Sequence, residues 1–309
     1  MVQKNSIKNK ILIICGATAT GKTDLAVQCA KRLNSEVISA DSMYIYKNLN
    51  VGTAKPSISE MQGVVHHLID VVKPDESFSV SDYKRLVEPK IQKLLSEGKI
   101  PVICGGTGFY INSILYDLSY GNAGANIEVR EKFKKIAEEQ GNLAVYKHLL
   151  SVDPDTANKL HPNDLKRVIR ALEIYYSSTK KSNIIDEFVP KYDYNAYAID
   201  YTREELYERI NNRVDLMLKN GLIDELNNLI SLGITREHQC MQAIGYKELF
   251  DYLDGVGSLE ETAELIKLNT RHYAKRQITF FKRLPNLRYL EKDKTDNLAE
   301  IIIRELNDD

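Results

Sequence analysis

The sequence has 309 residues and a formal net charge of −1, with 43% hydrophobic and 28% charged residues. At roughly 100–200 residues per domain, this length accommodates about two domains, and the hydrophobic fraction is that of a globular protein. Collagen-like order and wholesale disorder are excluded, and no hydrophobic run approaches the roughly 20 residues of a membrane-spanning helix. The four cysteines lie far apart without a C-x-x-C pair, which indicates buried thiols and favours a reducing, cytoplasmic location.

The first part of the sequence alternates short hydrophobic runs with amphipathic stretches. Strands are expected at 11–15, 36–40 and 101–104, with a weaker one at 66–72. The hydrophobic residues between 81 and 97 recur at helical spacing, as do those after Gly21. Alternating strands and helices of this length predict a parallel sheet that is covered by helices on both faces.

After about residue 117 the pattern becomes mainly helical. Helices are expected at 127–140, 142–151, 163–178, 202–220, 222–232 and 259–284. Alternation at 194–201 favours a strand that returns to the sheet. We therefore predict an α/β core formed by residues 1–119 and 186–309, with a mainly helical insertion at 120–185.

Residues 16–23 match the phosphate-binding pattern G-x-x-x-x-G-K-[ST] at every fixed position. The N–H groups of such a loop, and the positive end of the helix that follows it, bind a di- or triphosphate. The residues of this loop are Gly16, Ala17, Thr18, Ala19, Thr20, Gly21, Lys22 and Thr23. Lys22 would contact the terminal phosphates, and the Thr23 hydroxyl would ligate Mg²⁺. The motif predicts a P-loop NTPase-like parallel sheet, but it does not identify the molecule that carries the phosphates.

Two further groups follow predicted strands, where ligands bind in open α/β sheets. Asp41 ends the second strand, and its carboxylate could accept a proton from a nucleophile that attacks the phosphorylated substrate. A helix N-cap or an indirect partner of Mg²⁺ is the alternative role for Asp41. Residues 105–108, Gly-Gly-Thr-Gly, bring the Thr107 hydroxyl to the same edge, although a plain turn is the simpler explanation of this short run.

Basic residues cluster on three predicted helices. Lys166, Arg167 and Arg170 share one flank of their helix without a neighbouring acid on that face, and Arg209 and Arg213 lie one turn apart. Between residues 265 and 290 there is no Asp or Glu, and the basic residues are Lys267, Arg271, Lys275, Arg276, Lys282, Arg283 and Arg288. Because neutralised phosphates release counterions, this segment favours a nucleic acid, with a solvated helix face as the alternative.

Several motifs together resemble the bacterial tRNA dimethylallyltransferases, in order from residue 11 to about residue 290. They lie at 16–23, 41–46, 51–56, 66–70, 78–83, 105–110, 163–173, 242–247 and 270–279. The resemblance implies transfer of a dimethylallyl group from dimethylallyl diphosphate to N6 of the adenine at tRNA position 37. This base lies 3′ to the anticodon in tRNAs that read codons beginning with U, and the reaction requires Mg²⁺ and consumes no ATP.

The resemblance also implies roles for individual residues. Asp41 is the general base on N6, Thr107 positions the adenine, and Arg213 stabilises the pyrophosphate together with the P-loop and Mg²⁺. The implied tRNA contacts are Asp41, Ser42, Met43, Tyr44, Thr107, Lys166, Arg167, Val168, Ile169, Arg170, Gln242, Ala243, Ile244, Gly245, Tyr246 and Lys247, to which the basic segment adds Arg271, Lys275 and Arg276. The insertion at 120–185 would contribute to tRNA binding, and the target base must leave its stack to reach the site.

Three other functions explain only part of the sequence. A small-molecule kinase that uses Asp41 to activate a hydroxyl accounts for the first 110 residues, but it leaves the basic helix unexplained, as does prenylation of free AMP. A non-catalytic, NTP-dependent RNA-binding protein makes Asp41 and Thr107 accidental. We expect a monomer whose partners are the tRNA anticodon stem-loop and dimethylallyl diphosphate, with no membrane. Arg209 could replace Arg213 at the pyrophosphate.

Overall fold

The structure, a computed structural model, describes residues 9–118, 126–177, 181–183, 188–291 and 297–308. The chain divides into two compact units, of which the first comprises residues 1–115 and 190–309 and the second residues 116–189. The insertion predicted at 120–185 lies within the second unit. In the described part of the chain, no helix is both long and hydrophobic enough to span a membrane.

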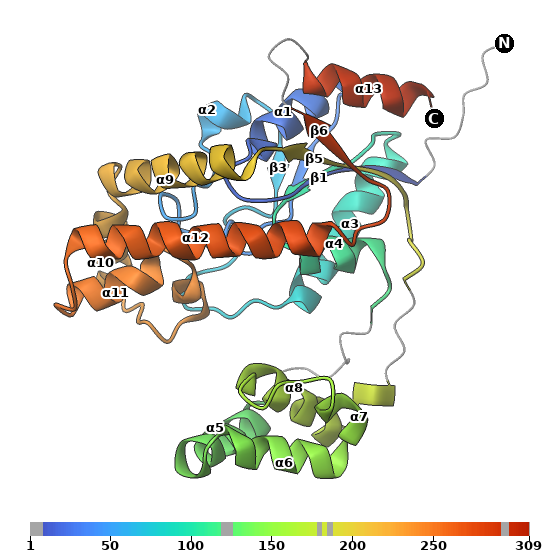
Figure 1. The fold of residues 1–309 in the computed structure, drawn as a ribbon. Coiled ribbons are helices and arrows are strands. Elements are labelled where there is room, and N and C mark those ends of the chain that lie inside the picture. The colour runs from blue at the N-terminus through green and yellow to red at the C-terminus, as the bar shows by residue number, and fades with distance from the viewer. Residues whose placement is uncertain (1–8, 119–125, 178–180, 184–187, 292–296, 309) are drawn as a thin grey trace. The chain divides into compact units, whose positions relative to one another are not determined.

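One sheet of six parallel strands, within the described residues, forms the centre of the first unit (Figure 1). The strands are β1 Lys10–Cys15, β2 Val37–Ser39, β3 His66–His67, β4 Val102–Gly105, β5 Asp193–Asp200 and β6 Leu287–Glu291. Their order in the sheet is β3-β2-β4-β1-β5-β6. Residues 11–15 of the central strand β1 are fully buried, as expected for a hydrophobic run that is covered on both faces. The predicted parallel α/β sheet is confirmed.

Two strands differ from the sequence prediction. The strand expected at 66–72 ends at His67, because Leu68 and Asp70 adopt positive φ angles of 61° and 55° that interrupt an extended chain. The last strand, β6, was not predicted, since its residues lie in a basic segment that was interpreted as part of a nucleic-acid-binding surface. It pairs with β5, so that Leu290 aligns with Ile199.

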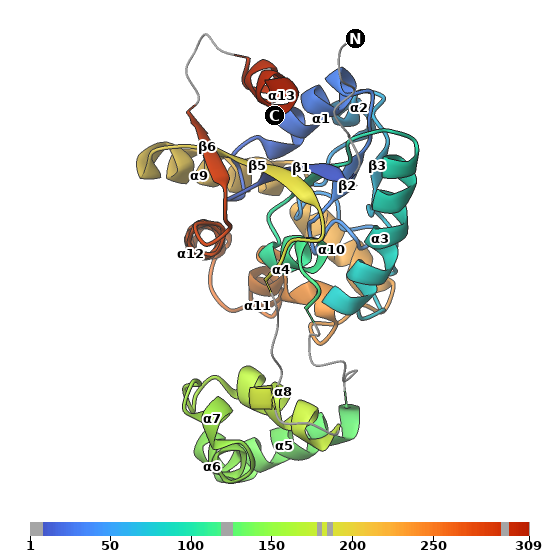
Figure 2. The same cartoon turned by 90° about the vertical axis from the view of Figure 1, so that its right-hand side faces the viewer.

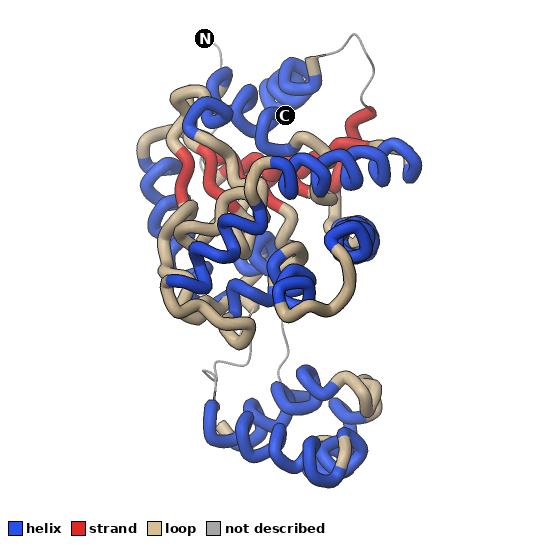
Figure 3. Tube along the Cα trace, turned by 90° about the vertical axis from the view of Figure 1, so that its left-hand side faces the viewer, coloured by secondary structure: helices blue, strands red, loops and turns tan. Residues whose placement is uncertain are grey.

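Helices cover both faces of this sheet. They are α1 Lys22–Arg32, α2 Ile58–Met61, α3 Val80–Ser96, α4 Gly108–Leu115, α9 Arg203–Lys219, α10 Leu222–Ser231, α11 Tyr246–Leu253, α12 Leu259–Phe281 and α13 Leu298–Asp308. On one face, Leu12 and Ile14 of β1, Leu25 of α1 and Ile302 of α13 belong to one buried hydrophobic cluster. Helices α4, α10, α11 and α12 lie on the other side of the sheet from α1 and α13 (Figures 2 and 3).

The second unit is helical. Its elements are α5 Ile127–Gln140, α6 Asn142–Val152, α7 Pro154–Ala157, α8 Leu165–Tyr176 and the 3₁₀ turn Lys181–Asn183. Phe133 of α5, Leu149 of α6 and Leu172 of α8 meet in its buried core. The helices expected at 127–140, 142–151 and 163–178 are therefore confirmed.

The four cysteines of the chain are buried and free, and burial raises the pKa of Cys104 to about 12.

Candidate active site

The phosphate-binding loop connects β1 to α1. Gly21 is the N-cap of α1 with φ 84°, a conformation that glycine adopts without the steric cost that a Cβ atom brings. No side chain caps α1 at this position, so the N–H groups of its first turn can bind an anion. The sequence prediction of a glycine-permitted loop that leads into a helix N-terminus is confirmed in geometry.

Two helices of the C-terminal half hold the loop in place. The Thr18 N–H donates to Gln277 Oε1 of α12 over 2.8 Å, and Arg209 Nε of α9 donates to the Ala19 carbonyl over 2.7 Å. The Arg209 guanidinium also lies 4.9 Å from the centre of the Tyr201 ring. Lys22 Nζ donates to the Ala17 carbonyl within the loop, and burial lowers the pKa of its ammonium group.

A cavity of about 550 Å³ opens beside this loop at the carboxyl ends of β2 and β4. Most of the predicted residues line it: Thr18, Ala19, Thr20, Gly21, Lys22, Thr23, Asp41, Ser42, Met43, Tyr44, Arg213, Gln242, Ala243, Ile244 and Arg276. Gly16 and Ala17 instead line a second cavity of about 400 Å³, together with residues of β5, α9 and α12. The sequence predicted that the P-loop and Asp41 lie at the same edge of the sheet, and Lys22, Thr23 and Asp41 indeed line one cavity.

Asp41 follows the end of β2, and Thr107 joins this strand end to the end of β4. The Met43 N–H donates to Asp41 Oδ1 over 2.9 Å, which fixes the orientation of the carboxylate. Thr107 Oγ1 accepts from the Ser42 N–H over 3.0 Å, and the Thr107 N–H donates to the Ala40 carbonyl over 3.0 Å. Thr107 thus lies behind Ser42, next to the residues that line the cavity.

The two neighbouring arginines of α9 have different positions. Arg213 lines the cavity beside Tyr44 and donates from Nη2 to the Thr53 carbonyl over 2.9 Å. Arg209 instead supports the P-loop through the Ala19 carbonyl. Burial and the charge of Asp41 raise the pKa of Tyr44, so its phenol remains a donor. Arg213 is therefore the better placed of the two for a ligand.

Glu225 of α10 was missed by the sequence analysis. Its carboxylate accepts from the N–H groups of residues 50, 51 and 52 over 2.7, 2.8 and 3.0 Å, and from the Tyr246 hydroxyl over 2.6 Å. The same loop presents the Thr53 carbonyl to Arg213, and its Ala54 carbonyl accepts from the Tyr44 hydroxyl over 2.8 Å. The motifs at 51–56 and 242–247 marked this region, but nothing in the sequence marked Glu225.

Two further residues of α12 were also missed. Tyr273 lines the cavity near Thr107 and Gln277, and burial raises the pKa of its phenol. Gln277 bridges the P-loop and the turn after β4, because its Nε2 donates to the Gly106 carbonyl over 2.9 Å while its Oε1 accepts from Thr18. Both residues belong to the motif at 270–279, which was the available signal, but neither of them was given a role from the sequence.

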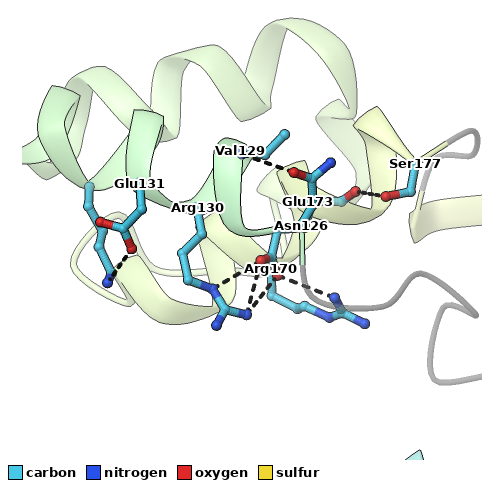
Figure 4. Close-up of polar contacts among 8 residues, drawn as sticks. Asn126, Val129, Arg130, Glu131, Arg170, Glu173 and Ser177 are labelled. Carbon is cyan, nitrogen blue, oxygen red and sulfur yellow. Dashed lines mark hydrogen bonds and ion pairs between the residues drawn. The ribbon is translucent and has the colours of Figure 1, made fainter. Parts of the chain in front are cut away.

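Several residues of α8 that were predicted to contact tRNA are buried or paired with a carboxylate. Val168 and Ile169 are buried in the core of the second unit, so their side chains face away from solvent. The basic flank is not free of acids: Arg167 lies 3.3 Å from Asp164, and Arg170 lies 3.2 Å from Glu173. Figure 4 shows Arg130 and Arg170 on the carboxylate of Glu173, whose side chain is 1% exposed. Of the predicted contacts, Lys166 and Arg167 are exposed.

The other predicted contacts divide in the same way. Gly245 and Tyr246 are buried, whereas Lys247 is exposed. Arg271 donates from Nη1 to Asn211 Oδ1 of α9 over 2.7 Å, so this end of the basic helix packs against a neighbouring helix. Lys275 and Arg276 are exposed.

Comparisons with known proteins agree with this geometry. The sequence model of the family described as IPP transferase matches residues 44–284. The chain is 44% identical over 305 residues to the tRNA dimethylallyltransferase of Alkaliphilus oremlandii, covering 97% of both chains. Its structure is similar to that of tRNA isopentenylpyrophosphate transferase from Bacillus halodurans, with a TM-score of 0.73, 40% identity and 97% and 98% of the two chains covered. A eukaryotic dimethylallyltransferase acting on tRNA has a TM-score of 0.83 and 30% identity, with 97% of this chain and 79% of that chain covered. The chain therefore belongs to the IPP transferase family and has its P-loop-like fold.

Proposed function

We propose that the protein transfers a dimethylallyl group from dimethylallyl diphosphate to N6 of the adenine at position 37 of tRNA. The observation that carries this proposal is that one cavity of about 550 Å³ is lined by the P-loop, by Arg213 and by the Asp41 carboxylate. A phosphate-binding loop, a cation and a proton acceptor around one space are what an allyl diphosphate and an amine nucleophile need. The relatives named as tRNA dimethylallyltransferases support the same reaction.

The phosphate side of the cavity would bind the pyrophosphate leaving group. As the bond between the allyl carbon and the diphosphate oxygen breaks, negative charge accumulates on that oxygen. The N–H groups at the start of α1, the Lys22 ammonium and the Arg213 guanidinium would stabilise this charge. Arg213 is held toward the cavity by the Thr53 carbonyl, which reduces the cost of orienting it during the reaction.

The residues present fit a magnesium ion. The Thr23 hydroxyl and the Asp41 carboxylate line the same cavity, and both are the hard oxygen donors that Mg²⁺ prefers. Thr23 would hold the ion, which when bound supplies positive charge to the diphosphate. The rest of the binding is performed by the P-loop itself.

On the acceptor side, Asp41 would act as the general base. The N6 amine attacks the allyl carbon, pyrophosphate leaves, and the proton lost by N6 passes to the Asp41 carboxylate. The Met43 N–H keeps this carboxylate in one orientation, over 2.9 Å. Thr107 and Tyr273, which lie near each other, would position the adenine. Adenine must be unstacked to enter the cavity, so an unpaired loop of tRNA is the appropriate substrate.

The remaining expectations follow from this reaction. We propose that Lys166, Lys247, Lys275 and Arg276, all exposed, contact the tRNA backbone. The four free thiols support a cytoplasmic location, and one chain supplies every residue of the proposed mechanism, as a monomer requires. The preference for tRNAs that read codons beginning with U belongs to the same proposal.

One experiment tests the proposed function. The protein is incubated with unmodified tRNA, Mg²⁺ and dimethylallyl diphosphate, and separately with ATP in place of the prenyl donor. We expect a prenylated adenosine in the nucleoside digest of the first reaction alone. Phosphoryl transfer from ATP would indicate a kinase, and tRNA binding without any product would indicate a binding protein.

A further inference from the structure

Two aromatic rings in contact, one exposed and one half-buried, lie close to the candidate active site. Phe109, the second residue of α4, is 62% exposed, although the residues that follow it in the helix are buried. The centre of its ring lies 5.6 Å from that of Phe280 on α12, and the two rings are tilted by 59°. The exposed part of this pair is aromatic surface beside α12.

The position of Phe280 is fixed by the turn after β4. A Cβ atom added to Gly108 would lie 2.1 Å from the Phe280 ring, so only glycine lets the ring sit directly on the first turn of α4. The neighbouring Phe281 is buried and belongs to the core. Phe280 is therefore held against α4, beside Phe109, by the local packing.

A groove of about 430 Å³ runs along α12 next to this pair. It is lined by His272, Lys275, Arg276, Thr279, Phe280 and Arg283. These described residues include three with a permanent positive charge and none with a carboxylate. Arg276 also lines the cavity of the candidate active site, so the groove adjoins that cavity.

We propose that Phe109 and Phe280 form a stacking platform for an unpaired RNA base, next to the base that enters the cavity. This inference rests on the proposed function and identifies where the rest of the RNA loop lies. Flat exposed rings bind the face of any base, and the cations of the groove are suited to the phosphates on either side of it. The aromatic and basic groups thus match one ligand, a single-stranded segment of RNA.

Phe109→Ala tests the platform, with binding of a labelled, unmodified anticodon stem-loop measured by fluorescence anisotropy at several salt concentrations. Loss of one base–aromatic stack predicts binding weaker by about 10-fold, and Phe109→Trp should restore it. The slope of affinity against salt should be unchanged in Phe109→Ala but reduced by about one in Arg283→Ala, because only the second variant loses a phosphate contact. Leu232→Ala, which removes a side chain that is 65% exposed at the end of α10, should bind like the wild type.

Abasic substitution identifies the partner base. One base of the stem-loop is removed at a time, and each RNA is titrated against the wild type and Phe109→Ala. We expect that removing one particular base beside the target adenine weakens RNA binding by the wild type. The same removal should not weaken RNA binding by Phe109→Ala any further, because this variant has already lost the stack. Equal RNA affinity of wild type and Phe109→Ala would overturn the platform, and a dimer that the variant abolishes would assign the face to a second copy of the chain. Prenylation by the wild type is measured in parallel, so failure of the proposed function remains distinguishable.

Discussion

The carboxylate of Glu225 provides a test of how the cavity keeps its shape. In Glu225→Gln, one of the two acceptor oxygens becomes an amide donor, which cannot accept from the N–H groups of residues 50–52. In the more favourable orientation of the new amide, its nitrogen replaces Oε1 and donates to the Tyr246 hydroxyl, which then acts as the acceptor. The bond from the Gly52 N–H to Oε1, 3.0 Å long in the wild type, is lost. A hydrogen bond to a charged group contributes about 1.5–3 kcal/mol, so we expect the free energy of unfolding to fall by about 2 kcal/mol.

The same change should slow the reaction. The loop that Glu225 holds also presents the Thr53 carbonyl to Arg213, which lies in the cavity. A loss of 1.4 kcal/mol in transition-state stabilisation is about tenfold in rate, so we expect kcat to fall about 10-fold with little change in KM for tRNA. Steady-state kinetics and thermal unfolding of the same preparation measure both effects.

Asp224→Asn is the matched control for Glu225→Gln. It also removes one carboxylate from the first turn of α10, but Asp224 is exposed and makes none of the bonds to residues 50–52. Its kcat should equal that of the wild type. If Glu225→Gln keeps wild-type kcat while its unfolding temperature falls, the carboxylate stabilises the fold alone and the reasoning about Arg213 is wrong.

Three other substitutions address the proposed mechanism. Asp41→Ala should retain tRNA binding, measured by anisotropy, and lose at least about 100-fold in kcat, since general-base catalysis contributes roughly 10²–10⁴; wild-type turnover would remove the proton-acceptor role. Arg213→Ala should lower kcat by about 100-fold through loss of a charge-stabilising donor, whereas Arg209→Ala should mainly lower the unfolding temperature; equal kinetic losses would contradict the division between them. Lys275→Ala combined with Arg276→Ala should weaken tRNA binding and make its salt dependence shallower, and unchanged binding across salt would locate the tRNA surface elsewhere.

Much of the first unit could be predicted because its strands are covered on both faces. Residues 11–15 form a continuous hydrophobic run for that reason, and the parallel arrangement brings Asp41 and the P-loop to the same edge of the sheet. The strand β6 was missed because Arg288, Tyr289 and Glu291 are exposed, and Leu290 is the one buried residue of this short run. Local sequence carries little signal for an edge strand of that kind.

The parts of the site that were not predicted depend on long-range contacts. Glu225 lies more than 170 positions from the loop that it binds, and no spacing rule connects them. The error at Val168 has a different origin, since helical periodicity alone places this residue on the apolar face with Leu172. The motif at 163–173 thus contains both exposed residues and residues, such as Val168, that pack in the core.

The side-chain amide of Gln277 links the P-loop to the turn after β4. Its oxygen holds the P-loop and its nitrogen holds the turn that leads to Thr107, and its helix also carries the basic groove. A ligand that moves α12 therefore also moves Gln277, which is bonded directly to the P-loop. If RNA binding changes the affinity for the prenyl donor by some factor, donor binding must change the affinity for RNA by the same factor.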